Sequence, residues 1–276
     1  MKIAMHEITT RDGTFPEHME AYAKTGWKHF EINMWHAEAY FTEHGIDAAV
    51  KVVTDNGLQC VGCTGISMSA FGDAEARQGD IDGVQKVGER MQALGCSALV
   101  VGCDVPAERT RENYPAHLDT MAAHVRQMAD AAAPFGVTIA AEVNWCALCK
   151  SYRTAADMVS RADRSNVGLI WDPAHFVSTP SRVDDLDLAR GKIVHAHLND
   201  IRADTHWEVM DINADRVIPG DGILPLKAWT EKVEECGYDG YHCVELFNAE
   251  LWDEDLETIC TKVMSGCKSV WPDAQF

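Results

Sequence analysis

The sequence of 276 residues predicts a (β/α)8 barrel that forms a single domain over residues 1–276. Eight strand-like apolar runs alternate with helical stretches, which implies parallel pairing of the strands. Four consecutive strands end in a strong ligand side chain, and in such a barrel the strand ends share the face that carries the active site. A doubly wound open sheet is the alternative. It is disfavoured because no Gly-x-Gly-x-x-Gly turn follows the first strand.

The elements follow one another in strand–helix order along the whole chain. The expected strands are Lys2–Glu7, Lys28–Asn33, Leu58–Thr64, Ala98–Gly102, Val137–Glu142, Val167–Asp172, Lys192–Leu198 and Tyr241–Leu246. The expected helices cover about Glu17–Thr25, Ile46–Asn56, Asp80–Leu94, Pro115–Pro134, Thr154–Ala162 and Leu226–Cys236, with a last one from about Asp253. Glycines that directly follow two of these stretches, Gly57 and Gly95, are typical helix stops.

Two predicted loops exceed the usual length of connections in such folds. They are Thr64–Gly79, after the third strand, and Asn199–Gly222, after the seventh. Long loops in a compact domain commonly act as lids or binding loops. The second loop carries Arg202, Asp204 and His206 and ends in the turn signal IPGDG.

The composition excludes several classes of function. The formal net charge of −19 repels nucleic acids and anionic lipid surfaces. No apolar run approaches the roughly 20 residues of a membrane span. Ten cysteines without a secretory signal indicate reduced thiols and a cytoplasmic protein. The expected partner is a small molecule, and a homo-oligomer is compatible with the sequence.

The stretch VHAHLND (Val194–Asp200) places His195 and His197 on one face of a strand, as expected near a barrel mouth. Three further strands end at Glu142, Asp172 and Glu245. Three carboxylates and the His197 imidazole in one arc of the mouth need a positive charge among them. A divalent cation is the simplest answer. The oxygen-rich set favours Mn²⁺ over a structural zinc, with Mg²⁺, Co²⁺ and Zn²⁺ as alternatives.

Four segments make the sequence similar to the xylose isomerase-like TIM-barrel superfamily, the sugar phosphate isomerase/epimerase group. They are AAEVNW (Ala140–Trp145), WDPAHF (Trp171–Phe176), HAHLND (His195–Asp200) and GYDGYHCVELF (Gly237–Phe247). The resemblance implies that Glu142, Asp172, His197 and Glu245 hold the metal. It also implies that His175 binds substrate and that Glu142 and Glu245 transfer protons.

These roles are chemically consistent with a sugar or polyol isomerase or epimerase. A cation that chelates a carbonyl oxygen and a neighbouring hydroxyl acidifies the adjacent carbon, and a carboxylate can then remove its proton to give an enediolate. Glu142 and Glu245, at the two ends of the ligand arc, could address opposite faces of the substrate.

Three other functions compete with this one. HLNDIR and IPGDG resemble segments of inosose dehydratases, so a dehydratase acting on a cyclic polyol ketone or on 3-dehydroshikimate is the runner-up. A non-catalytic sugar-binding barrel would not need the full ligand set. Endonucleases of the superfamily carry additional histidine ligands on strands three and four, which here end near Cys63 and Cys103.

Other residues give weaker signals. His6 and Glu31 would line the opposite half of the mouth and could hold sugar hydroxyls, and Arg202 could clamp a carboxylate or phosphate. A structural hydrogen bond or loop salt bridge is the alternative for each. His195 lies one layer deeper than His197 and is expected to support or pack. Two Cys-x-x-Cys pairs, Cys60/Cys63 and Cys146/Cys149, invite a zinc site, but strand geometry sends i and i+3 to opposite faces.

Overall fold

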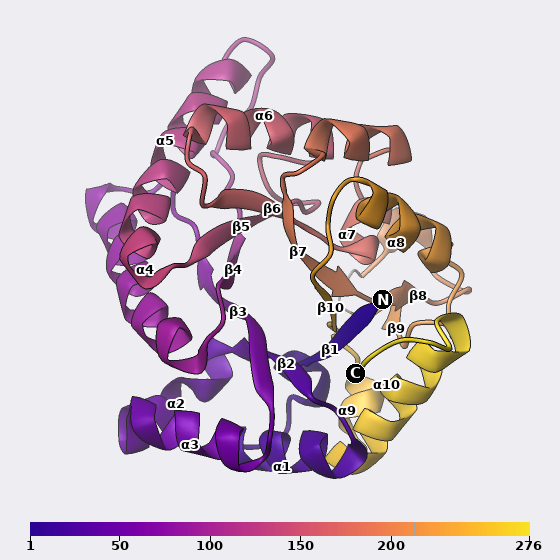
Figure 1. The fold of residues 1–276 in the computed structure, drawn as a ribbon. Helices are drawn as coiled ribbons and strands as arrows, with labels where there is room; N and C mark the ends of the chain where they lie inside the picture. The colour runs from indigo at the N-terminus through magenta and orange to yellow at the C-terminus, as the bar shows by residue number, and fades with distance from the viewer. Residues whose placement is uncertain (212–213) are drawn as a thin grey trace.

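The structure is a computed structural model that describes residues 1–211 and 214–276. Within these residues eight parallel strands close into a barrel surrounded by helices (Figure 1), which confirms the predicted fold class. Around the wall the strands run β1 (Lys2–His6), β10 (Tyr241–Val244), β7 (Ile193–Leu198), β6 (Val167–Trp171), β5 (Thr138–Glu142), β4 (Ala98–Gly102), β3 (Gln59–Ser67) and β2 (His29–Asn33).

Helices follow the strands and cover the outside of the barrel. They are α1 (Phe15–Thr25), α2 (Met34–His44), α3 (Ile46–Asp55), α4 (Ala74–Leu94), α5 (Tyr114–Ala132), α6 (Tyr152–Ala162), α7 (Pro173–Val177), α8 (Leu226–Glu235), α9 (Ala249–Trp252) and α10 (Leu256–Val270). None of the helices in the described chain is long and apolar enough to cross a membrane.

Side-chain caps explain where the helices differ from expectation. The Asn33 side chain accepts hydrogen bonds from the amides of Trp35 and His36, so that α2, which was not predicted, starts directly at the end of β2. Asp73 likewise caps the start of α4 through the Ala76 amide. Because β3 continues to Ser67 and α4 begins at Ala74, the expected long loop 64–79 is much shorter.

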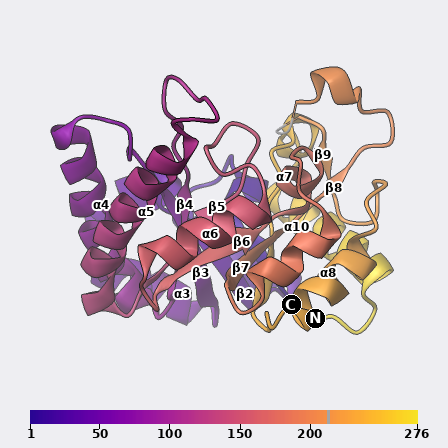
Figure 2. The ribbon, with the colours of Figure 1, turned by 90° about the horizontal axis from the view of Figure 1, so that it is seen from above.

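The loop after β7 is not irregular, because it folds back as a small antiparallel hairpin. Strand β8 (Asp200–Ile201) pairs with β9 (Arg216–Val217). This hairpin and α7 lie at the end of the barrel away from the chain termini (Figure 2). The hairpin therefore stands over the carboxyl ends of the strands, where the ligand residues are.

A bulge in β7 determines which side chains enter the barrel. Leu169 is paired with Ile193, but the next residue of β6, Ile170, is paired with His195. Val194 is therefore the extra residue. It packs on the small interior cluster with Ile170, while His195 and His197 also point inward. In a regular strand, neighbouring residues point to opposite faces. If Val194 pointed inward in a strand without the bulge, His195 and His197 would therefore point outward.

Gly168 makes room for this bulge inside the barrel. A Cβ atom at Gly168 would lie 2.4 Å from a methyl carbon of Val194 and 2.6 Å from the Lys192 carbonyl oxygen. The larger apolar core lies outside the barrel, between strands and helices, and includes Leu169 and Trp171.

His242 lies in this outer apolar layer and not in the site. Its ring contacts those of Trp171 and Tyr238, and neither ring nitrogen has a hydrogen-bond partner among the described residues. Burial lowers the pKa of His242 to about 3, so the ring is neutral in the native protein.

We expect His242→Phe to make the protein less sensitive to acid. The native pKa lies below that of the unfolded chain, so the wild type loses stability as the pH falls below about 6.5, with the loss ending near a pH of about 3. At pH 5 this histidine alone lowers the free energy of unfolding of the wild type by about 2 kcal/mol relative to neutral pH. Urea unfolding of both proteins at pH 7.5 and pH 5 measures the difference.

The matched control is His44→Gln, at the exposed end of α2. It should leave the pH dependence of unfolding as in the wild type. Equal acid sensitivity of His242→Phe and wild type would show that His242 is not held neutral.

Candidate active site

Three of the four expected metal ligands converge at the carboxyl ends of the strands. One ligand atom each of Asp172, His197 and Glu245 lies within 4.8 Å of the other two. The Nδ1 atom of His197 is 3.1 Å from Glu245 Oε2 and 3.6 Å from Asp172 Oδ2. All three side chains are buried. The barrel thus gathers two carboxylates around one imidazole nitrogen.

The fourth expected ligand, Glu142, faces the same site but is held by other partners. Its Oε1 lies 3.5 Å from His175 Nε2, and its Oε2 accepts a hydrogen bond of 3.0 Å from the Asn144 amide. His175 sits in α7, whose first turn is capped by Asp172 through the His175 backbone amide. The Asp-Pro-Ala-His segment therefore places His175 beside Glu142.

Sequence reasoning missed Arg216, which lies among the acidic groups. Its guanidinium bonds to Glu245 and stands 3.5 Å from Asp172 Oδ2 and 3.2 Å from His175 Nε2. The group is 1% exposed and lies over the Phe247 ring. Only its position before the IPGDG turn hinted at it, because the fold-back of the hairpin is not visible in the local sequence.

Arg202, the arginine singled out in the sequence, occupies a different environment. Its guanidinium pairs with Asp204 at 2.7 Å, and both side chains are substantially exposed, at 42% and 75%. No hydrogen bond or ion pair among the described residues links Arg202 to Asp172, His197 or Glu245. The structure therefore places Arg216, and not Arg202, at the cluster.

Asp200 holds the hairpin that carries Arg216. Its buried carboxylate accepts hydrogen bonds from the backbone amides of Ile201, Gly220, Gly222 and Leu224. A Cβ at Gly222 would come within 2.4 Å of the carboxylate, so the close approach requires glycine there. The neighbouring Asn199 donates to Asp172 Oδ2 and accepts from the Ala174 amide. The segment His197–Asp200 therefore contains the expected ligand His197 together with Asn199, which holds Asp172, and Asp200, which holds the hairpin.

His6, Glu31 and His195 form a second buried cluster that adjoins His197 and Glu245. His6 Nε2 lies 3.6 Å from Glu31 and 3.7 Å from Glu245. Its Nδ1 accepts the Ile8 amide hydrogen, so the proton of the neutral ring is on Nε2 and is donated to the Thr64 hydroxyl oxygen at 3.2 Å. His195 Nε2 lies 2.6 Å from Glu31. These side chains are fully or almost fully buried.

The charges in the cluster shift the pKa values of its members in opposite directions. Burial raises the pKa of Glu245, but the charges of His197 and Arg216 outweigh burial and lower it to about 2. For Asp172, burial is likewise outweighed, mainly by Arg216 and His175, and the pKa falls well below its usual range. Burial lowers the pKa of His197, but Glu245 and Glu31 raise it well above the usual value.

Glu142 and His175 form a second, less strongly charged pair. Burial raises the pKa of Glu142, and the charge and hydrogen bond of His175 then bring it below its usual value. The pKa of His175 is raised because Glu142 and Asp172 together outweigh its burial. Glu142 has fewer cationic neighbours than Glu245, so it is better suited to accept a proton.

The residues fit a divalent cation. His197 Nδ1 is buried and has no hydrogen-bond partner in the described chain, although two carboxylate oxygens lie nearby. These spacings resemble the roughly 3.3 Å between ligands of a tetrahedral ion with bonds of about 2.0–2.1 Å. Arg216 supplies a permanent positive charge next to the carboxylates of Glu142, Asp172 and Glu245, whereas the other positive charges depend on protons held by His197 and His175. A cation would complete the neutralisation.

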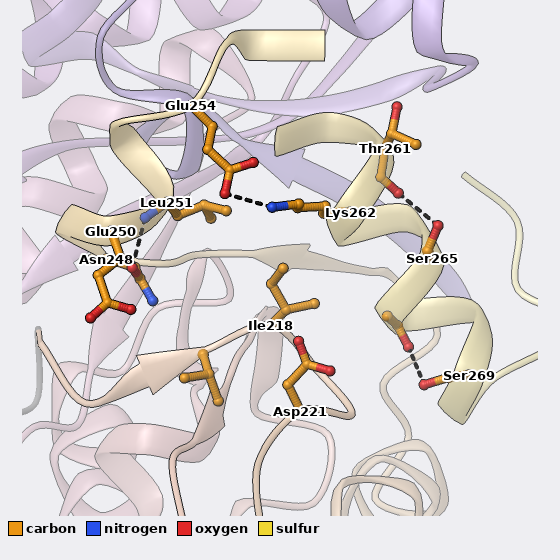
Figure 3. Close-up of a pocket in the computed structure, with 12 residues that line it drawn as sticks. Ile218, Asp221, Asn248, Glu250, Leu251, Glu254, Thr261, Lys262, Ser265 and Ser269 are labelled. Atoms are coloured by element: carbon orange, nitrogen blue, oxygen red, sulfur yellow. Dashed lines mark hydrogen bonds and ion pairs between the residues drawn. The ribbon is translucent and has the colours of Figure 1, made fainter. Parts of the chain in front are cut away.

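The cavity in Figure 3 is separate from this cluster. It has a volume of about 660 Å³ and lies between the segment after β9, the start of α9 and one side of α10. None of its lining residues belongs to the cluster. Within it, Lys262 is paired with Glu254.

The two Cys-x-x-Cys pairs do not form metal sites in the described chain. The groups of potential ligands found there include neither pair. Cys60, Cys63 and Cys149 are buried, whereas Cys146 is exposed beside Asn144. All ten cysteines are free thiols.

Comparison with known proteins finds a matching family model and relatives that are named as enzymes. The protein-family model described as xylose isomerase-like TIM barrel matches residues 19–262 of this chain. An inosose isomerase of Bacillus velezensis is 26% identical over 258 residues, which cover 91% of this chain and 90% of that protein. A 3-dehydroshikimate dehydratase of Pseudomonas aeruginosa is 29% identical over 247 residues, 86% of this chain and 36% of the relative.

Solved structures agree with the fold. The crystal structure of an IolI protein with a bound zinc atom superposes with a TM-score of 0.88 at 24% identity, covering 98% of both chains.

Proposed function

The chain belongs to the xylose isomerase-like TIM barrel family, and we propose that it is a divalent-metal-dependent isomerase or epimerase of a keto-sugar or polyol ketone. Relatives that match most of the chain are enzymes named as isomerases and a dehydratase, which supports an enzymatic role here. The fold alone hosts many chemistries, so the proposal depends on the site.

One observation carries the proposal. Asp172, His197 and Glu245 converge on one point, and the Glu142–His175 pair faces them across the same mouth. This arrangement places the proposed metal ligands Asp172, His197 and Glu245 on one side and the Glu142–His175 pair, which can exchange protons, on the other. A domain that only bound sugar would need neither the buried carboxylates nor the histidine that adjoins Glu142.

A divalent cation held by Asp172, His197 and Glu245, with Glu142 as fourth ligand, would polarise a substrate carbonyl and acidify the carbon beside it. Three carboxylates and one imidazole are a set that suits Mn²⁺, although the similar IolI structure contains zinc. Affinity should fall as the pH falls, because the proton on His197 competes for Nδ1.

Glu142 is the favoured group for removing the substrate proton. In the described part of the chain its carboxylate contacts His175 and Asn144, whereas that of Glu245 contacts both His197 and Arg216. His175 Nε2, at 3.5 Å, can orient the Glu142 carboxylate and contact a substrate oxygen. Glu245, on the other side of the ligand group, is the candidate for returning a proton to the opposite face.

Arg216 and His6 add donors at the two sides of Glu245. Arg216 reaches Glu245 and His175, and its fixed guanidinium suits binding of a substrate oxygen that gains negative charge. We assign Arg216 to the substrate-binding group in place of Arg202, and keep His6 as a second donor through Nε2.

A cyclic polyol ketone of the inosose type is the proposed substrate class. The inosose isomerase relative aligns over nearly its full length. A ring ketone flanked by hydroxyls offers the carbonyl and neighbouring hydroxyl that the site requires. Among the described residues, the arginine at the cluster is Arg216, which is already paired with Asp172 and Glu245, so the site does not call for a phosphorylated substrate.

A dehydratase is the second candidate. The dehydratase relative covers 86% of this chain. Elimination starts with the same proton removal, but then needs an acid beside the leaving hydroxyl. His175 has a raised pKa and could supply that proton.

The first prediction concerns the cation. Wild-type protein should bind about one equivalent of Mn²⁺ or Zn²⁺, and Asp172→Ala should lose tight binding because a ligand and a negative charge are removed. Asp172→Asn, which keeps an oxygen to cap α7, should weaken binding as well. Elemental analysis after dialysis and chelator competition measure both.

The matched control is Asp119→Asn, an exposed aspartate paired with Arg161 on the outer helices. It should bind metal like the wild type. Undiminished metal content in both Asp172 variants would contradict the assignment of this ligand.

The second prediction tests His175. His175→Ala should retain the cation, because His175 is not in the ligand group, but should lower kcat by about 10²-fold or more. Kinetics on a cyclic polyol ketone and metal analysis of the same sample give both values. His117→Ala, at an exposed histidine of α5, is the control. Loss of metal from His175→Ala would make this histidine a ligand.

The third prediction separates the two reactions. For an isomerase or epimerase, Glu142→Gln and Glu245→Gln should each stop turnover. With metal bound, Glu245→Gln should still exchange the substrate proton with deuterium in D₂O, because Glu142 remains. Proton NMR of recovered substrate measures the exchange. Release of an unsaturated product that absorbs in the ultraviolet, without label in recovered substrate, would identify a dehydratase.

A further inference from the structure

Glu31 is a buried acidic group that the proposed reaction does not use. It lies in the middle of β2, paired with Gly62 of β3, and its side chain is fully buried. A Cβ at Gly62 would stand 2.5 Å from the His195 ring and 3.4 Å from the Glu31 carboxyl carbon. Glycine at this position therefore leaves the space in which Glu31 and His195 meet.

Both oxygens of Glu31 are occupied by protein donors. Oε1 accepts a hydrogen bond of 2.6 Å from the Thr64 hydroxyl, and Oε2 lies 2.6 Å from His195 Nε2. His197 Nε2 lies 3.3 Å from Oε1 and 3.2 Å from Oε2. With these contacts and no exposed surface, Glu31 acts as a hydrogen-bond acceptor within the protein, which is the alternative that the sequence left open for it.

A second metal ion at Glu31 would have to displace hydrogen bonds that its oxygens already make. Glu31 belongs to two further groups of potential ligands, one with His6 and His197 and one with His195 and Cys243. However, Glu31 Oε2 lies 2.6 Å from His195 Nε2, and Glu31 Oε1 lies 2.6 Å from the Thr64 hydroxyl oxygen. These are hydrogen-bond distances. Two ligands of one tetrahedral ion would stand roughly 3.3 Å apart.

The neighbours of the Glu31 carboxylate are hydrogen-bond donors. The Thr64 hydroxyl donates to Oε1, and ring nitrogens of His195, His197 and His6 lie 2.6, 3.2 and 3.6 Å from its oxygens. An ionised carboxylate accepts hydrogen bonds and donates none. His197 must therefore present a proton to Glu31 on Nε2, and in the neutral ring the lone pair is then on Nδ1. That is the unpartnered nitrogen between Asp172 and Glu245.

We propose that Glu31 is a positioning residue that fixes the ring and tautomer of His197, so that Nδ1 is presented to the cation. His195 and Thr64 hold the Glu31 carboxylate in place from the two other sides. This role rests on the proposed metal-dependent function, because it needs a cation at Nδ1. It adds a carboxylate–histidine–metal relay across the inside of the barrel, from β2 to β7.

The test compares two buried glutamates. Glu31→Gln keeps the size of the side chain but removes the charge, and should raise the Kd for Zn²⁺ by about 10–100-fold while one equivalent still binds at saturation. Glu7→Gln is the matched control. Glu7 is equally buried and contacts a histidine, His18, but not His197. Its Kd should equal that of the wild type by chelator competition.

A second measurement needs no substitution at Glu31. In ¹⁵N-histidine-labelled, zinc-loaded wild type, long-range ¹H–¹⁵N spectra should show His197 protonated on Nε2 and bound through Nδ1, with its signals assigned by their loss in His197→Asn. Binding through Nε2 would overturn the proposal, as would equal Kd values for Glu31→Gln and Glu7→Gln. Wild-type protein that takes up neither Zn²⁺ nor Mn²⁺ would overturn the proposed function itself, and this role with it.

Discussion

The need to neutralise buried carboxylates governs the arrangement of this site. Asp172, Glu245 and Glu31 are almost completely removed from solvent, where isolated negative charges are strongly disfavoured. Each is ionised only because positive or proton-donating groups surround it. The protein places Arg216 and His197 on one side and His195 and Thr64 on the other. The negative charge that remains is what the proposed cation would neutralise.

Much of this arrangement depends on a loop that looks irregular in the sequence. Arg216 can enter the cluster because β8 and β9 pair, and the hairpin is held because Asp200 ties the amides of residues 220–224 to the end of β7. Strand β7 thus contains His197, the proposed ligand, and Asp200 shortly after it anchors the hairpin with Arg216. The positive charge of Arg216 balances the carboxylates of Asp172 and Glu245. Changes at Asp200 would act on the site although the side chain touches no ligand.

The sequence predicted the parts of the molecule that depend on local patterns. The barrel followed from eight strand–helix repeats, and Asp172, His197 and Glu245 were found because each ends a strand. Arg216 and the hairpin were not found, because pairing across the 14 residues between Ile201 and Arg216 depends on tertiary contacts. Helix α2 was missed because its start is determined by the Asn33 side chain and not by an apolar period.

The bulge at Val194 has a consequence for how relatives of this chain are compared. The inward direction of His195 and His197 is set by one extra residue of backbone, not by the letters His-Ala-His themselves. A homologue that keeps the motif but pairs β6 and β7 without the bulge would turn both imidazoles toward the helices. Conversely, two homologues can place their histidines at the same point in space although an alignment needs a gap of one residue in β7 to match them. Ligand residues on β7 are therefore matched correctly by strand register, and alignment of identical residues alone can mislead.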